Sequence, residues 1–128
     1  MSFTSSASGL FVVTYRTAAE LLPEAQTPLV SALRLAVERG RVGIIFDVGD
    51  AITSVDLSVP SFWLDVTSRL QLSAMSIVTR SIGVRVAARG FKLAQFARKH
   101  PIEVEVHETV DDALTWMRAR LDVVAATG

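Results

Sequence analysis

One segment restricts the fold more than any other: residues 42–48 read Val-Gly-Ile-Ile-Phe-Asp-Val, an almost unbroken apolar run. A strand with one wet face would alternate apolar and polar residues, whereas a run of this kind is typical of a strand covered on both faces. We therefore expect residues 42–48 to lie inside a sheet, with other elements packed above and below it.

Strands and helices alternate on either side of this segment. β-Branched and aromatic residues predict a strand at 10–15, a further strand follows at 72–79, and clean alternation predicts a half-exposed or edge strand at 102–108. Apolar residues at helical spacing predict four helices, which are expected at 28–40 after Thr27, from Pro60 to Leu70 after Ser58, from Ile82 to Ala94 after Ser81, and from Val110 to Leu121 after Thr109. Gly90 weakens the third helix and could end a first short one.

This order, without repeats or an internal linker, predicts an α/β fold in a single domain. We expect a mixed or largely parallel sheet of four to five strands and about four helices. The expected domain covers residues 10–122, with a flexible N-terminal tail at 1–9 and a C-terminal tail at 123–128. With half of its 128 residues hydrophobic and a fifth charged, the chain has the composition of a folded domain.

Composition also bears on location. Residues 1–9 lack the basic and apolar regions of a secretion signal, and no apolar run approaches the ~20 residues of a membrane-spanning helix. The chain has no cysteine, which excludes disulfides, thiolate metal sites and a cysteine nucleophile. We expect a cytoplasmic protein without a transmembrane segment.

The common catalytic and nucleotide-binding motifs are missing. No phosphate loop is present, no Gly-x-Gly-x-x-Gly follows a strand, and His100 and His107 are not at a metal-ligand spacing. His107, which lies between two glutamates, could be a proton shuttle, but a residue on the wet or edge side of its strand is the simpler interpretation. We expect no enzyme activity, no metal and no cofactor, and hence a function in binding or regulation.

Four carboxylates gather around the end of the 42–48 strand: Asp47, Asp50, Asp56 and Asp65. They could form an acidic metal or phosphotransfer pocket, but loop and cap roles explain them as well, and Asp65 should face away on its helix. The sequence leaves these alternatives open.

A basic region follows them, because no acidic residue lies between Asp65 and Glu103. Arg85, Arg89 and Lys92, with Lys99 beyond them, fall roughly along one helical stripe and form a candidate anion-binding face. A neutral net charge and the absence of interleaved aromatic residues argue against nucleic acid. A solvated face is the simplest interpretation, with an anionic partner protein or lipid surface still open.

The order of elements resembles the STAS domain, the module of bacterial anti-sigma-factor antagonists, over residues 10–121. Residues 44–47, Ile-Ile-Phe-Asp, resemble the family's strand ending in Asp, and residues 19–21, Ala-Glu-Leu, resemble its Gly-x-Leu. Residues 56–59, Asp-Leu-Ser-Val, resemble the Asp-Ser-Ser-Gly that opens its second helix. Residues 88–91 are similar to the turn after its third helix, and residues 109–114 to the start of its last.

This resemblance implies a regulatory protein-protein interaction module whose partner is a kinase, anti-sigma factor or other signalling protein. In the family, that kinase phosphorylates the serine that opens the second helix, and the matching residue is Ser58. The expected recognition surface spans residues 47–62 and includes Asp47, Asp56, Ser58 and Phe62. A plain N-cap is the alternative role for Ser58, since Leu57, Val59 and Pro60 depart from the motif.

A second alternative concerns the whole chain. Extra sequence at about 92–101, where the compact family has a short connection, leaves open a small-molecule or lipid carrier of similar topology. The sequence does not set the oligomeric state, and a dimer is compatible with it.

Overall fold

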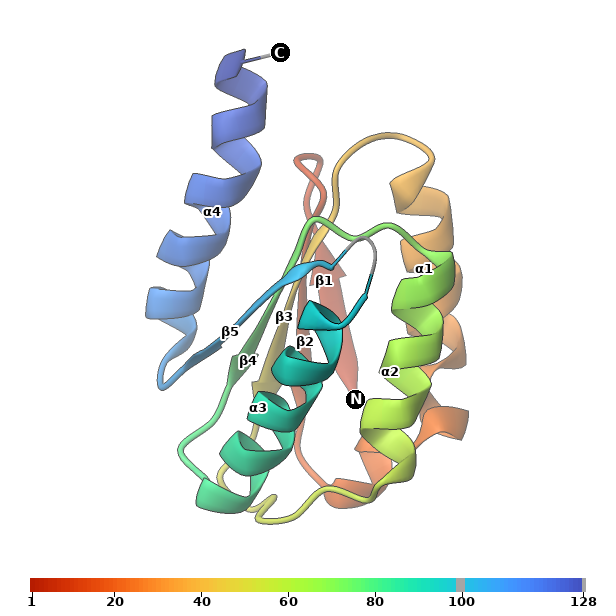
Figure 1. Cartoon of the computed structure of the whole chain (residues 1–128), viewed down its shortest axis with the longest axis vertical. Coiled ribbons are helices and arrows are strands. Elements are labelled where there is room, and N and C mark those ends of the chain that lie inside the picture. Colours follow the sequence, from red (N-terminus) through yellow and green to blue (C-terminus); the bar gives the residue numbers. More distant parts are fainter. Residues whose placement is uncertain (99–100, 128) are drawn as a thin grey trace.

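The computed structural model describes residues 1–98 and 101–127, and over these residues the chain forms one five-stranded sheet with α-helices on both faces (Figure 1). The strands are β1 (Ser2–Ser5), β2 (Leu10–Tyr15), β3 (Gly43–Val48), β4 (Ala74–Val78) and β5 (Glu103–His107). The four α-helices in this part of the chain are α1 (Thr27–Val37), α2 (Ser58–Arg69), α3 (Ile82–Phe96) and α4 (Val110–Thr127). Two short 3-10 helices, η1 (Ala18–Leu21) and η2 (Pro23–Gln26), precede α1. The predicted α/β class, mixed sheet and helix number are confirmed.

The strands lie in the sheet in the same order as in the chain. β1 is antiparallel to β2, whereas β2, β3, β4 and β5 are parallel, so that Phe46 of β3 lies between Val13 and Ile77. Right-handed crossovers that step in one direction across a sheet place all their helices on one face. Accordingly, α1, α2 and α3 cover one face, and α4, which follows the last strand, stands against the other (Figure 1).

β3 is covered on both faces, as its apolar sequence predicts. Ile44, Phe46 and Val48 belong to the large core beneath α1, α2 and α3. Ile45 faces the opposite way, into a smaller core with Met117 of α4. Among the described residues, no helix has both the length and the apolarity needed to cross a bilayer.

Both segments expected as tails contain regular secondary structure. Ser2–Ser5 is strand β1, and the Phe3 ring stacks on Phe11 of β2 with centroids 6.3 Å apart. The N-terminal ammonium group also pairs with Glu20. At the other end, α4 continues to Thr127, so that only residue 128 of the expected tail lies outside the described residues.

The third helix also differs from the expectation. α3 runs through Gly90 without a break, so the residues 88–91 that resemble a family turn are helical. Tertiary packing offsets the poor helix propensity of Gly90, because Ala88 and Phe91 on either side of it are buried in the large core. α1 begins at Thr27 itself, one residue earlier than predicted.

Candidate functional site

The side chain of Asp56 bonds to the start of α2, and Ser58 is not the cap of this helix. Ser58 is the first residue of the helix, and Leu57 occupies the cap position without a side-chain bond to the helix. The Asp56 Oδ1 atom accepts hydrogen bonds from the Ser58 backbone N–H at 2.9 Å and from the Ser58 hydroxyl at 2.6 Å. These two bonds lower the pKa of Asp56. The prediction that Ser58 caps the helix is therefore wrong, although the pairing of Asp56 with Ser58 is real.

Leu57, the residue between Asp56 and Ser58, points into solvent. Leu57 is 84% exposed, and Ser58 beside it is also exposed. Phe62, one turn further along α2, is half-buried and packs edge-on against Trp63 with ring centroids 5.4 Å apart. Leu57 and Ser58 are therefore the accessible part of the recognition surface expected at residues 47–62. Phe62 packs inward and helps to hold α2 in place.

Asp47 belongs to a different part of the molecule. Residues alternate along β3, with Phe46 facing α1, α2 and α3 and Ile45 facing α4, so Asp47 has the orientation of Ile45. It is separated by the sheet from Ser58, which lies on the α2 side. Burial raises the pKa of Asp47, and the nearby Asp50 carboxylate raises it further.

The predicted carboxylate cluster does not assemble. Asp65 lies exposed on α2, where it pairs with Arg69 at 3.4 Å. Within residues 1–98 and 101–127, no three histidine, aspartate or glutamate side chains come together in a way that could hold a metal ion.

A contact with α3 fixes the loop that leads into α2. A Cβ atom added at Gly83 would overlap the carbonyl oxygen of Thr53, so the helix start and the loop touch backbone to backbone. The Ser81 hydroxyl, which caps α3 by accepting from Val84 N–H at 3.3 Å, also lies 3.4 Å from the same Thr53 oxygen. Sequence analysis missed this contact, and a glycine two residues after the cap of α3 is its only signal.

A small apolar cavity lies between the sheet, α2 and α3. Its volume is about 80 Å³, and the residues around it include Phe46, Val59, Trp63, Val84 and Ala88. The hydroxyl of Tyr15, which also borders it, donates to Gln26 Oε1 at 2.7 Å, and burial raises the pKa of Tyr15. Pockets for small-molecule ligands measure roughly 300–1,000 Å³, so this cavity would have to widen to admit a lipid.

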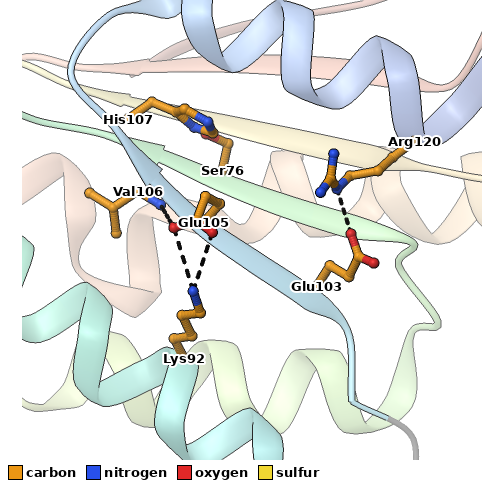
Figure 2. A network of polar contacts seen from close by, with 7 residues as sticks. All are labelled: Ser76, Lys92, Glu103, Glu105, Val106, His107 and Arg120. Atoms are coloured by element: carbon orange, nitrogen blue, oxygen red, sulfur yellow. Dashed lines mark hydrogen bonds and ion pairs between the residues drawn. The ribbon is translucent and has the colours of Figure 1, made fainter.

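The three predicted cations of the anion-binding face lie on α3, and two of them are ion-paired. Arg85 Nη2 lies 3.5 Å from Glu108 Oε1. Figure 2 shows the second pair, in which Lys92 Nζ lies 3.2 Å from Glu105 Oε2. A hollow of about 260 Å³ beside them is bordered by both signs of charge. Burial alone would raise the pKa of Glu105, but its bonds with Val106 N–H and Lys92 outweigh burial and lower it.

Arg89 is the exception. It is exposed, and it has no ion-pair partner in the part of the chain that the structure describes. Lys99, the fourth cation of the predicted stripe, lies outside the described residues.

His107 lies beneath α4 and is half-buried. Its Nδ1 atom is 2.7 Å from Ser76 Oγ on β4 (Figure 2). The centroid of its ring lies 5.4 Å from that of Trp116. The guanidinium carbon of Arg120 lies over the Trp116 ring, 3.9 Å from its centroid, and Arg120 also pairs with Glu103. Ser76 has no exposed surface, so its hydroxyl cannot meet a substrate in this conformation. This arrangement joins β4, β5 and α4, and burial lowers the pKa of His107.

No protein-family model matches the chain, and neither the curated proteins nor the solved structures include a significant match. The resemblance to STAS domains therefore depends on the order of elements and the short motifs described above. The local geometry of the α2 start is the firmest basis for a functional hypothesis.

Proposed function

We propose that this chain is a non-enzymatic, cytoplasmic regulatory domain of the STAS type, which binds a signalling partner through the surface formed by Asp56, Leu57 and Ser58. The observation that carries this proposal is the exposure of Leu57, a large apolar side chain at the accessible start of a well-anchored helix. The partner would be a protein of the kinase or anti-sigma class, as the resemblance implies.

The surrounding structure favours binding because it holds Leu57 in place. Asp56 bonds to the first residue of α2, and Gly83 brings α3 against the preceding loop. A preorganised surface loses little conformational entropy when a partner binds. Full burial of a leucine side chain contributes about 1.5–3 kcal/mol, which is enough to make Leu57 a dominant contact.

Ser58 supplies a means of switching this surface off. Its hydroxyl is exposed and now donates to Asp56. Phosphorylation would remove that donor and place about two negative charges beside the carboxylate, which repels them and disturbs the helix start. Partner binding should therefore weaken when Ser58 is phosphorylated.

A quantitative pull-down from native lysate tests the proposal. Leu57→Ser and Ser58→Asp should each remove the same partner, whereas Leu35→Ser, at an exposed leucine of α1, should retain it. An identical set of partners for wild type and both α2-start variants would contradict the proposal. Mass spectrometry of the protein from its native cells would show separately whether Ser58 carries phosphate.

The second candidate is a carrier of a small apolar molecule or lipid, and the cavity beneath α2 and α3 favours it. At about 80 Å³ the cavity is too small for a lipid unless these helices separate. If the chain is a carrier, native mass spectrometry of freshly purified protein should show a bound ligand. Ala88 lines the cavity, so Ala88→Leu should fill part of it and reduce the fraction of protein that carries the ligand. A mass equal to that of the free chain would count against a carrier.

A further inference from the structure

The outward face of α3 is apolar where a solvated helix is normally polar. Ile82, Val86, Leu93 and Phe96 are between 64% and 79% exposed. At 3.6 residues per turn they fall within an arc of about 80°, so they form one stripe along the helix. The buried residues of α3, such as Phe91, lie on the opposite side. We call these four exposed residues the α3 stripe.

Positive charge accompanies the α3 stripe over its whole length. Arg89 lies within it by helical position, and Arg85 and Lys92 border it on the side of β5. The sequence contains no acidic residue between Asp65 and Glu103, so no negative charge from α3 or its flanking turns offsets these cations. The glutamates that pair with Arg85 and Lys92 belong to β5 and the turn after it, and long basic side chains can exchange such exposed partners for others.

The shape and the charge together select an occupant. A protein partner would have to supply a groove for this convex ridge, and a second copy of the chain would bring Arg89 and its basic neighbours against themselves. An anionic bilayer accepts a convex apolar ridge and attracts cations at its rim. We propose that α3 lies flat on anionic membrane surfaces, with the α3 stripe in the headgroup and acyl boundary and Arg85, Arg89 and Lys92 on lipid phosphates.

This proposal does not depend on the function of the α2 start, since the two surfaces use different residues. It extends the possible roles of the domain from binding one protein to recruitment at a lipid surface. The basic residues predict that the chain prefers anionic lipids to neutral ones. The α3 stripe predicts that attraction between charges is not sufficient for membrane binding without the apolar contact.

Vesicle flotation with the full chain tests it directly. Vesicles of phosphatidylcholine mixed with phosphatidylserine should carry the protein to the top of the gradient, whereas vesicles of phosphatidylcholine alone should not. Raising the salt concentration should weaken binding, because ionic screening reduces attraction between exposed charges.

Matched substitutions separate the apolar and charged contributions. Leu93→Gln and Phe96→Gln should each weaken binding about tenfold, and Leu35→Gln on α1 should leave it unchanged. Arg89→Glu should weaken it by a similar factor, while Arg34→Glu, an exposed arginine of α1, should not. All these side chains are exposed, and circular dichroism would confirm that each variant is folded.

Three results would overturn the proposal. The first is failure of the wild-type chain to float with phosphatidylserine vesicles at low salt. The second is flotation that survives the Leu93→Gln, Phe96→Gln double substitution. The third is a concentration-dependent dimer in analytical ultracentrifugation that this double variant dissociates, without flotation of the wild type, which would assign the α3 stripe to self-association.

Discussion

The Nδ1 atom of His107 lies 2.7 Å from the hydroxyl oxygen of Ser76, a residue with no exposed surface. The bond crosses from β5 to β4 beneath α4, with the Trp116 ring beside it. It has a direct consequence for stability in acid.

The folded state should favour neutral His107. Burial lowers the pKa of this histidine below its ordinary value of 6.5, and the carboxylates of Glu105 and Asp112 offset burial only in part. The unfolded chain therefore takes up the proton at a higher pH than the folded chain. The contribution of neutral His107 to the free energy of unfolding is fully present above pH 6.5 and falls as the pH drops through and below that value. Urea denaturation from about pH 8 to about pH 5 should show this decline, and His107→Gln should flatten it. An unchanged slope in the variant would assign the decline to other groups.

The two glycines of α3 should respond in opposite ways to alanine. Nothing lies within 4 Å of a Cβ added at Gly90, so Gly90→Ala should raise the free energy of unfolding by about 1 kcal/mol through helix propensity. A Cβ at Gly83 would overlap the Thr53 carbonyl oxygen, and Gly83→Ala should cost about 1–3 kcal/mol. Thermal denaturation of both variants measures the difference. Equal melting temperatures would mean that the loop before α2 yields freely.

Thr67 should be critical for the contact between α2 and α3. Its Oγ1 atom accepts hydrogen bonds from Gln95 Nε2 at 2.9 Å and Arg98 Nη1 at 2.8 Å, and it donates to the Trp63 carbonyl at 2.8 Å. Thr67→Val keeps the shape but leaves the buried amide without its acceptor, which should cost about 1–3 kcal/mol in chemical denaturation. Thr67→Ser, which retains the hydroxyl, should recover most of the loss.

Gln95 provides the contrast to Thr67. Its Oε1 atom is the only buried side-chain oxygen or nitrogen without a hydrogen-bond partner in the part of the chain described. Gln95→Met fills the same space without that oxygen, so it should cost less than Thr67→Val. A greater loss of unfolding free energy for Gln95→Met than for Thr67→Val would show that the Gln95 amide stabilises the fold by more than its hydrogen bond to Thr67 accounts for.

Asp47 should reduce stability at neutral pH. Its pKa is raised by burial and by Asp50, so ionisation is less favourable in the folded state than in the unfolded chain. Asp47→Asn should therefore raise the free energy of unfolding by less than ~1 kcal/mol near neutrality, and the gain should vanish in acid as the wild-type carboxyl takes up its proton. Denaturation at both pH values checks this, with Asp65→Asn, which loses an exposed ion pair, as a control that should not stabilise.

The sequence predicted most of the fold because hydrophobic periodicity is a local signal. The apolar run at 42–48 and the alternation at 102–108 correspond to the doubly covered strand β3 and the edge strand β5. β1 was missed because it has only four residues, two of which are serine, and its order comes from pairing with β2 and from the contact between Phe3 and Phe11. Continuity of α3 through Gly90 likewise depends on distant packing.

The candidate surfaces were less predictable than the fold. Residues 56–59 were found by their motif, but only the structure shows that Asp56 bonds to the first residue of α2 and that Asp47 lies on the other side of the sheet. The α3 stripe was not predicted, because α3 has apolar residues on two sides and its outward side was interpreted from the cations Arg85, Arg89 and Lys92 alone.

The order of the strands has a consequence for how the domain can form during its synthesis. Each strand of the sheet pairs with the one before it in the chain, so the sheet grows only at its edge and no later segment has to be inserted between strands already paired. A nascent chain leaving the ribosome can therefore add one β-α unit at a time to a surface that is already in place. Helix α4, which follows the strands, then closes the face of β3 and β4 that α1, α2 and α3 leave open.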